Sequence, residues 1–450
     1  MQLLPLDSLT SIFQWLETKD RISCSHVCKL FRQTLVNAEY DSVLWPKKEL
    51  KKLLPTHYQF PLIKQVLQRQ LLGVEDQVTP ISFAEKHTTF ATHLTSHDNL
   101  VIAWNCESKK YAGPITIWQS RLKENRPTCN LASAAPVTAE HPFGICLAEV
   151  TVHENWLIRT TYDPLQDEQF LLLDIWELDK KSGEAKEVIT QKIPVNPPRI
   201  NSNAFSLAPP VCHGNSLFLP IPYSNMTQVW DLEGIPRYIE SIGNPYYRYV
   251  KDLVIHDGVL IIKTFSGCTT IDLKGSGKKV DQLYLTHGST AKQFYYRADD
   301  NGQLLLTDLS RQKEGTEPDF ILAADLQDRK CGYIRVTDNW LIGDFQRKNQ
   351  KKGFSIFNLS TQTKDGSAIP EYGFIPRPIG DSIRTLVGWH QLVLSFQNKC
   401  LVYSLWDLRA DGAPNKLYEL PQDTKIMTTA FHNGLLIAAT NDGKIWKFPV

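Results

Sequence analysis

VWDLE, at residues 229–233, is one copy of an ending that recurs along the chain: an apolar β-like run, an aromatic or branched residue, an acid or amide, and then Leu. Other clear copies are IWELD (175–179), TIDLK (270–274), LTDLS (306–310), IFNLS (356–360) and LWDLR (405–409). The marker residues are Trp118, Trp176, Trp230, Ile271, Thr307, Phe357, Trp406 and Trp446. Most neighbouring markers are roughly 40 to 50 residues apart, a period that indicates a repeated sheet unit.

A second element precedes most markers: an apolar strand, a tight polar turn and another apolar strand. Examples are VTVHENWLIRTTY (150–162), LVIHDGVLIIKTF (253–265) and TAFHNGLLIAAT (429–440). Asp-Gly and Asn-Gly favour short hairpins, because Gly accepts the positive φ that such turns require. Each unit is therefore expected to run through strand a, a turn, strand b, a variable loop, strand c and a weakly marked strand d.

From about residue 80 onward this pattern resembles the WD-repeat family. The resemblance implies a β-propeller, which we place at residues 78–450. The repeats are divergent, because only Trp230-Asp231 and Trp406-Asp407 carry the literal dipeptide and the family's upstream Gly-His pair is missing. Eight markers predict eight blades, with seven as the alternative because the copy at Thr307 is weak. We also expect residues 78–84, VTPISFA, to complete the last blade and close the ring.

Residues 1–45 have a different pattern. Leu9, Ile12, Phe13 and Leu16 fall at i, i+3, i+4 and i+7, the apolar stripe of an amphipathic helix. A unit of about forty residues cannot bury so many large apolar groups alone. Each one left in water forgoes about 1.5–3 kcal/mol, so a partner surface is expected. The alternative is that these helices pack on the propeller.

The order of residues in this segment resembles the F-box. The matching positions are Leu4-Pro5, Leu9, Ile12-Phe13, Leu16, Lys19-Asp20, Val27-Cys28-Lys29, Phe31-Arg32 and Leu44-Trp45. The resemblance implies a three-helix unit that docks on the Skp adaptor of a cullin-RING ubiquitin ligase. It further implies an adaptor-binding surface made of Leu4, Pro5, Leu9, Ile12, Phe13 and Leu16. We therefore expect an α plus all-β multidomain chain.

Residues 46–77 form a basic connector between the two parts. PKKELKKLL (46–54) reads as one or two helical turns, and PLIKQVLQRQLLG (61–73) reads as a helix with a buried apolar stripe. The Lys and Arg residues could form a nucleic-acid or nuclear-import patch, but a run of this kind is more often a solvated helix face. We interpret the connector as a stiff helical spacer between adaptor and propeller.

Composition excludes several classes of protein. With 42% hydrophobic and 22% charged residues, the chain has an ordinary globular composition. The net charge of +1 gives no overall field that would favour nucleic acid or a membrane, so neither is expected as a partner. Nine scattered cysteines and no recognisable signal peptide favour the cytoplasm. The nucleus is an alternative, and so is host cytoplasm if the chain is a bacterial F-box mimic.

No catalytic motif is recognisable, so we expect neither an enzyme nor a cofactor or metal. His97, His153, His213, His256 and His432 occupy equivalent turns, which should spread them around the ring and not gather them on one ion. A quinoprotein-type enzyme also uses an eight-bladed ring. That class is normally exported, which disfavours it here.

Basic and aromatic residues gather in loops that WD-repeat geometry would place on one face, formed by the b–c loops and the d–a connections. The segments are NCESKKYAGP (105–114), NPYYRYVKD (244–252), QRKNQKKGF (346–354) and GFIPRPIGD (373–381). The candidate substrate-binding residues are Lys109, Lys110, Arg248, Tyr249, Arg347, Lys348 and Arg377. Such groups suit an acidic or phosphorylated peptide. The alternative is that these lysines are solvated hairpin tips.

Together these features predict a non-enzymatic substrate receptor of a Skp–cullin–F-box ubiquitin ligase, in which the F-box binds the adaptor and the propeller binds a protein substrate. The alternative is a propeller scaffold with no link to a ligase.

Overall fold

A computed structural model describes the chain from residue 93 to residue 449. Excepted within that span are residues 99, 105–106, 109–114, 120–128, 132–145, 163–169, 196–206, 244–248, 265–266, 275–279, 285–288, 300–302, 311–318, 325, 338–339, 348–351, 360–367, 379–382, 389–390, 406–407, 409–410, 433–434 and 443. The predicted F-box, the connector and the ring-closing segment 78–84 lie outside the described residues. Their structure therefore stays a prediction.

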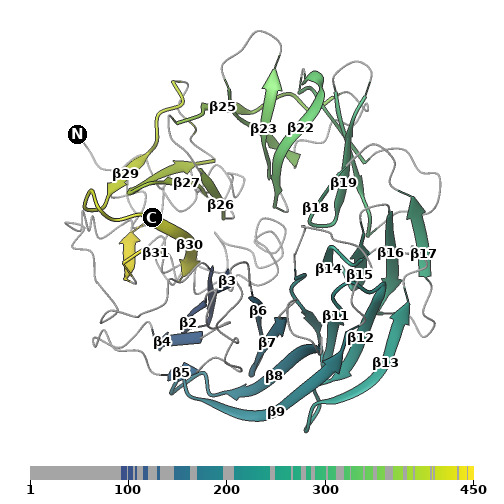
Figure 1. Cartoon of the computed structure of the whole chain (residues 1–450). Helices are drawn as coiled ribbons and strands as arrows, with labels where there is room; N and C mark the ends of the chain where they lie inside the picture. The colour runs from purple at the N-terminus through teal and green to yellow at the C-terminus, as the bar shows by residue number, and fades with distance from the viewer. Residues whose placement is uncertain are drawn as a thin grey trace, which may run out of the picture.

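The described residues form eight antiparallel sheets arranged as a ring (Figure 1). The first sheet contains β1 (His93–His97), β2 (Leu100–Trp104), β4 (Ile115–Gln119) and β5 (Cys129–Leu131). The second contains β3 (Glu107–Ser108), β6 (Cys146–His153), β7 (Trp156–Tyr162), β8 (Phe170–Leu178) and β9 (Ala185–Pro194). The third contains β10 (Val211–His213), β11 (Ser216–Pro220), β12 (Met226–Asp231) and β13 (Arg237–Gly243).

The later sheets repeat this order. The fourth contains β14 (Asp252–His256), β15 (Val259–Lys263), β16 (Gly267–Asp272) and β17 (Val280–Tyr284), and the fifth contains β18 (Ser289–Ala291), β19 (Phe294–Ala298), β20 (Leu304–Asp308) and β21 (Phe320–Leu322). The sixth contains β22 (Leu326–Val336), β23 (Trp340–Arg347), β24 (Gly353–Asn358) and β25 (Gly373–Pro376), and the seventh contains β26 (Arg384–Val387), β27 (Gln391–Phe396), β28 (Lys399–Ser404) and β29 (Lys416–Glu419). The eighth contains β30 (Ile426–His432), β31 (Leu435–Thr440) and β32 (Ile445–Pro449).

Each marker that the structure describes lies on strand c of its sheet, as the repeat predicts. Trp176 is on β8 and Trp230 on β12, and even the weak copy places Thr307 on β20. Trp406 lies outside the described residues, directly after β28 and Leu405. The expected meander of strands a, b, c and d is the observed order in six sheets, while the second sheet adds β3 beside β6 and the described part of the eighth has three strands.

The a–b turns also form as predicted. Between β14 and β15, Asp257 and Gly258 have φ values of 50° and 78°. Both lie in the left-handed region that a type I′ hairpin turn requires. Glu154 adopts φ 49° at the start of the equivalent turn between β6 and β7. These turns reverse the chain within two residues and hold strand a beside strand b.

Two predicted loop boundaries are wrong. Residues 105–114 are not all loop, because Glu107–Ser108 forms β3 and pairs with Leu147 and Cys146 of β6 in the next sheet. Residues 373–381 do not all connect strand d to strand a, because Gly373–Pro376 is itself strand d, the outer strand β25. Short strands of this kind carry too few residues to show an alternating apolar pattern.

The hydrophobic core lies between neighbouring sheets. Side chains of the second and third sheets form one apolar cluster that includes Ile158, Leu173, Leu217 and Trp230. A buried side chain of this size contributes about 1.5–3 kcal/mol, so the ring is held together mainly by sheet-to-sheet packing. Among the described residues, no helix is long and apolar enough to span a membrane.

The ring closes by contact between its first and last sheets. Val101 and Trp118 of the first sheet share an apolar cluster with Ile437 and Ala439 of the eighth. The Ser96 hydroxyl donates a 2.8 Å hydrogen bond to the backbone carbonyl of Phe431. The described part of the eighth sheet has three strands, and the fourth strand from residues 78–84 stays a prediction.

Histidines at the ends of a strands connect one sheet to the next. His97 Nε2 lies 2.9 Å from the carbonyl oxygen of Glu154, and His153 Nε2 lies 2.8 Å from that of Gly214. Because a carbonyl oxygen only accepts, Nε2 carries the proton in both bonds. Burial lowers the pKa of His97, which favours the neutral ring. The predicted structural role of these turn histidines is therefore confirmed for His97 and His153.

Candidate functional site: the b–c face

The two ends of the sheets form two faces of the ring. One carries the a–b and c–d turns. The other carries the b–c turns and the d–a connections, and we call it the b–c face. In a meander these connections must alternate between the two ends of a sheet. The b–c face holds the described members of the predicted substrate-binding set.

Backbone hydrogen bonds tie b–c turns to d–a connections on this face. The Val250 amide donates to the Ser224 carbonyl at 3.4 Å, and the Arg377 amide donates to the Lys352 carbonyl at 3.0 Å. Val250 and Arg377 belong to d–a connections, and Ser224 and Lys352 belong to b–c turns. Two b–c turns of this face are therefore joined to d–a connections, which can hold their side chains in fixed positions.

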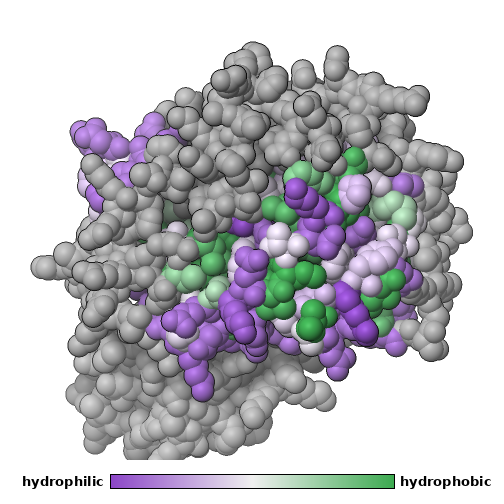
Figure 2. Space-filling view, turned by 60° about the horizontal axis from the view of Figure 1, so that its bottom comes forward, coloured by the Kyte–Doolittle hydropathy of each residue, from purple (hydrophilic) through white to green (hydrophobic). Residues whose placement is uncertain are grey.

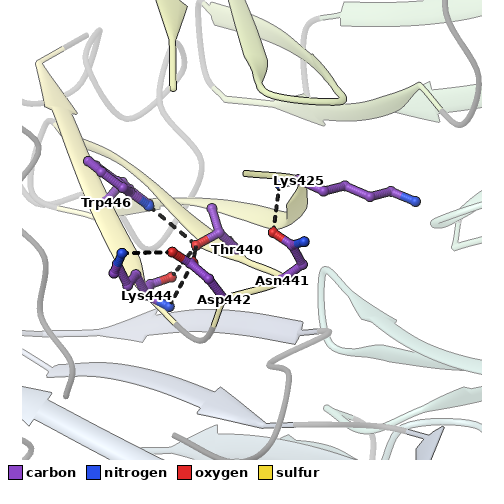
Figure 3. Close-up of polar contacts among 6 residues, drawn as sticks. All are labelled: Lys425, Thr440, Asn441, Asp442, Lys444 and Trp446. Atoms are coloured by element: carbon purple, nitrogen blue, oxygen red, sulfur yellow. Dashed lines mark hydrogen bonds and ion pairs between the residues drawn. The ribbon is translucent and has the colours of Figure 1, made fainter. Parts of the chain in front are cut away.

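The b–c turn of the eighth sheet shows how such a loop is fixed (Figure 3). The Asn441 side chain accepts a 2.6 Å bond from the Lys425 amide, while the Asn441 amide donates back to the Lys425 carbonyl at 2.9 Å. Thr440 Oγ1 accepts from Nε1 of the marker Trp446 at 3.3 Å and donates to the Lys444 carbonyl at 3.0 Å. The marker Trp446 is therefore hydrogen-bonded to the b–c turn that precedes it in the chain.

Three tyrosines from separate segments converge between the second, third and fourth sheets. Tyr223, in the b–c turn of the third sheet, lies 5.6 Å from Tyr162 and 5.3 Å from Tyr249 between ring centroids. Tyr223 has φ 55°, an uncommon conformation for a bulky residue. Burial, together with the neighbouring Tyr249, raises the pKa of Tyr223 to about 12, so its hydroxyl remains a hydrogen-bond donor at neutral pH.

A buried lysine lies at the same end of the fourth sheet. The Lys263 side chain is 1% exposed, and its ammonium donates a 2.9 Å hydrogen bond to Asp252 Oδ2. Burial lowers the pKa of Lys263, and the Asp252 carboxylate opposes this shift. Removing Asp252 would leave a buried cation without its carboxylate partner, so the pair holds β14 and β15 together at the face.

The structure does not gather the predicted substrate-binding residues into one cluster. Tyr249 packs edge-on against Tyr223 near β14, whereas Arg377 follows β25, elsewhere on the ring (Figure 1). Arg377 donates a 2.8 Å bond to Asp344, so its charge is already compensated. Arg347 is the last residue of β23, in register with Leu326. The remaining four, Lys109, Lys110, Arg248 and Lys348, lie outside the described residues, as do all six predicted adaptor-binding residues.

Sequence reasoning missed Tyr223, Asp252 and Lys263 on this face. One signal was available, because Lys263 ends the otherwise apolar strand VLIIK, where an unpaired lysine would be costly. Among the described residues, no group of three or more His, Cys, Asp or Glu side chains could hold a metal ion.

Comparison with known proteins identifies the amino-terminal segment. Residues 1–39 match the F-box domain. The chain combines an F-box domain with a β-propeller. A search of curated proteins finds no match.

Several solved structures resemble this chain at low sequence identity. A computationally designed protein, Ika8, matches with a TM-score of 0.50 and 13% identity, covering 81% of this chain and 98% of its own. The β-propeller domain of Myceliophteria thermophila Cps50 (Swd1) has a TM-score of 0.40 and 13% identity, covering 67% of this chain and 95% of its own. Kluyveromyces lactis Hsv2p has a TM-score of 0.39 and 11% identity, covering 64% and 89%. At these identities, the likeness to Ika8 concerns the fold alone.

Proposed function

We propose that this protein is the substrate-recognition subunit of a Skp–cullin–F-box ubiquitin ligase. The observation that carries the proposal is the F-box match at residues 1–39. F-box domains typically bind the Skp adaptor within cullin-RING ligases. The apolar stripe of Leu9, Ile12, Phe13 and Leu16 supplies a surface of the kind that a helix uses to enter a partner's groove.

In this proposal the propeller holds a protein substrate on its b–c face. The joined loops and the Tyr223–Tyr249 contact support this choice, because rigid aromatic groups bind with little loss of side-chain entropy. Lys109, Lys110, Arg248, Arg347 and Lys348 would favour an acidic or phosphorylated segment. We further propose that each of the eight described sheets is one blade of an eight-bladed ring.

The protein would act by proximity and perform no chemistry itself. Holding a substrate lysine beside a charged conjugating enzyme makes the transfer effectively unimolecular. This work would take place in the cytoplasm, with the nucleus as an alternative compartment.

Binding to purified Skp adaptor tests the proposal. We expect the full chain to bind, and Phe13→Ala with Leu16→Ala to weaken binding by at least tenfold, since truncating central apolar anchors typically costs about 2 kcal/mol or more. A matched control is Lys19→Ala, which changes a charge near the stripe and should have little effect. A wild-type chain that fails to bind the adaptor would favour the propeller scaffold without a ligase role.

Affinity capture from eukaryotic lysate tests the division of labour between the two parts. Deleting residues 1–45 should remove adaptor and cullin together while other captured proteins remain. If adaptor and cullin stay bound to the deleted chain, the F-box is not their binding site.

A further inference from the structure

Three apolar side chains within five residues of sequence are exposed on the outer rim of the third sheet. Ile235 is 76% exposed in the c–d turn, and Tyr238 and Ile239 of β13 are 49% and 52% exposed. We call these residues the rim triad. Figure 2, in which the β9 and β13 side of the ring comes forward, shows apolar side chains interrupting a polar surface. Apolar side chains that are exposed together on a protein surface typically mark an interaction site, so the rim triad is a candidate for one.

The second sheet shows that the fold does not require an apolar rim. In both sheets the marker tryptophan pairs across to the outer strand beside a one-residue bulge: Trp176 faces Glu187 and Trp230 faces Tyr238. The bulged residues are Val188 and Ile239. The same backbone therefore carries an acid in one sheet where it carries tyrosine in the other.

Contacts within the third sheet hold Tyr238 in position. Its ring lies edge-on to Trp230 with centroids 6.1 Å apart, and its hydroxyl is 3.0 Å from Ser241 Oγ. Arg237 beside it is held by Asp231 at 3.1 Å. A fixed aromatic ring among exposed aliphatic side chains resembles the anchors that dominate protein interfaces, because little entropy is lost on binding.

The chemistry around the rim triad defines the partner. A bulge twists an outer strand and protects its edge, which disfavours addition of another strand at β13. A stable contact between two copies needs roughly 20–30 residues a side, far more than this group. Within residues 231–240, Asp231 is paired with Arg237, and Glu233 places a negative charge two residues before Ile235. We propose that the rim triad docks a short amphipathic helix of another protein, with an apolar stripe flanked by Lys or Arg.

This docking site is separate from the adaptor surface and from the b–c face. It would let the ring hold a second protein while the b–c face is occupied. It therefore goes beyond the proposed function and does not depend on it.

The test uses the purified full chain and a labelled helical peptide of about 18 residues, or five turns, with a leucine stripe and lysine flanks. Fluorescence anisotropy should show saturable binding. Ile235→Lys together with Tyr238→Glu, which places the second sheet's residue type at position 238, should weaken binding at least tenfold. Ile235→Lys alone alters a largely exposed turn, so it keeps the test valid if the double variant folds poorly. The matched control, Glu187→Ala on the second sheet, should bind like the wild type.

Two comparison peptides and one mass measurement complete the experiment. A peptide with glutamate flanks, and one with serine in place of leucine, should each bind at least tenfold more weakly. Equal binding by either peptide, or binding unchanged in Ile235→Lys, would refute the proposal. A wild-type dimer by light scattering that becomes monomeric in Ile235→Lys would also overturn it, because the occupant would then be a second copy.

Discussion

The second and third sheets share one backbone arrangement but differ in the charge of the side chains at equivalent positions. Both carry the marker tryptophan, the bulge beside it and a histidine at the end of strand a. The second sheet buries an ion pair, in which Arg159 and Asp174 are 2% and 3% exposed and 2.8 Å apart. The equivalent cross-strand pair in the third sheet is Leu219 and Gln228. The fold thus depends on the shared features, while the side chains at these positions can vary.

The two tryptophans are supported differently as a result. The Arg159 guanidinium lies 4.8 Å from the ring centroid of Trp176 and stacks over its face. In the third sheet, Trp230 Nε1 instead donates a 3.1 Å bond to Gln228. One blade therefore uses charge and the other a neutral hydrogen bond to hold the same residue.

The largest expected effect comes from removing one member of the buried ion pair. Asp174→Ala removes the carboxylate that pairs with the buried Arg159 charge and should lower the free energy of unfolding by about 3–5 kcal/mol. Arg159→Leu combined with Asp174→Gln installs the third sheet's pair and should restore most of that loss. Urea unfolding followed by tryptophan fluorescence measures both. If the double variant is no more stable than Asp174→Ala, the two sheets are not interchangeable at these positions.

A second difference concerns pH. Burial raises the pKa of Glu149 on β6 to about 7, above its usual value of 4.5, whereas the third sheet has Pro209 at the same distance before its turn histidine. A raised folded-state pKa means that the protonated form is favoured, so stability falls as pH rises from about 4.5 through 7. Glu149→Gln should therefore gain at most about 3 kcal/mol relative to wild type between pH 4 and 8. Parallel pH–stability curves for the two proteins would contradict this.

The hydrogen bond to Trp230 should have a smaller effect. Gln228→Ala leaves the indole N–H without its acceptor and should cost about 1–2 kcal/mol. Thermal unfolding measures the loss, with exposed Glu177→Ala of the second sheet as the control that should change little. A Gln228→Ala protein as stable as the control would show that the bond is not needed to hold the tryptophan.

The turn histidines give the smallest expected effect. His153→Ala removes the bond to Gly214 and should cost about 1 kcal/mol. His213 in the third sheet is exposed, and His213→Ala should stay within about 0.5 kcal/mol of wild type. Denaturation midpoints of the two variants, measured side by side, test this difference. Equal midpoints would show that the His153 bond adds no stability beyond that of His213.

Sequence predicted those parts of the fold that are local. Asp257-Gly258 predicted its turn because the φ requirement belongs to two adjacent residues. The markers predicted the c strands because a period needs no knowledge of contacts. Arg159 and Asp174 could not be recognised as buried, because partners in neighbouring strands are set by register, which a single strand does not reveal.

The candidate site was less predictable for a related reason. Charged loop residues identified the b–c face as a chemically suitable surface, but Arg377 already pairs with Asp344, which is 33 residues earlier. Tyr223 meets Tyr249 only because two sheets pack side by side. Contacts of this kind arise from the packing of sheets in the ring, so the sequence of either segment alone does not predict them.

The described histidine bonds run in one direction, each from the end of a first strand to the turn of the following sheet. The second sheet supplies both a donor forwards, from His153, and an acceptor backwards, the Glu154 carbonyl. Copies of such a unit placed in series would satisfy one another's polar groups at each join.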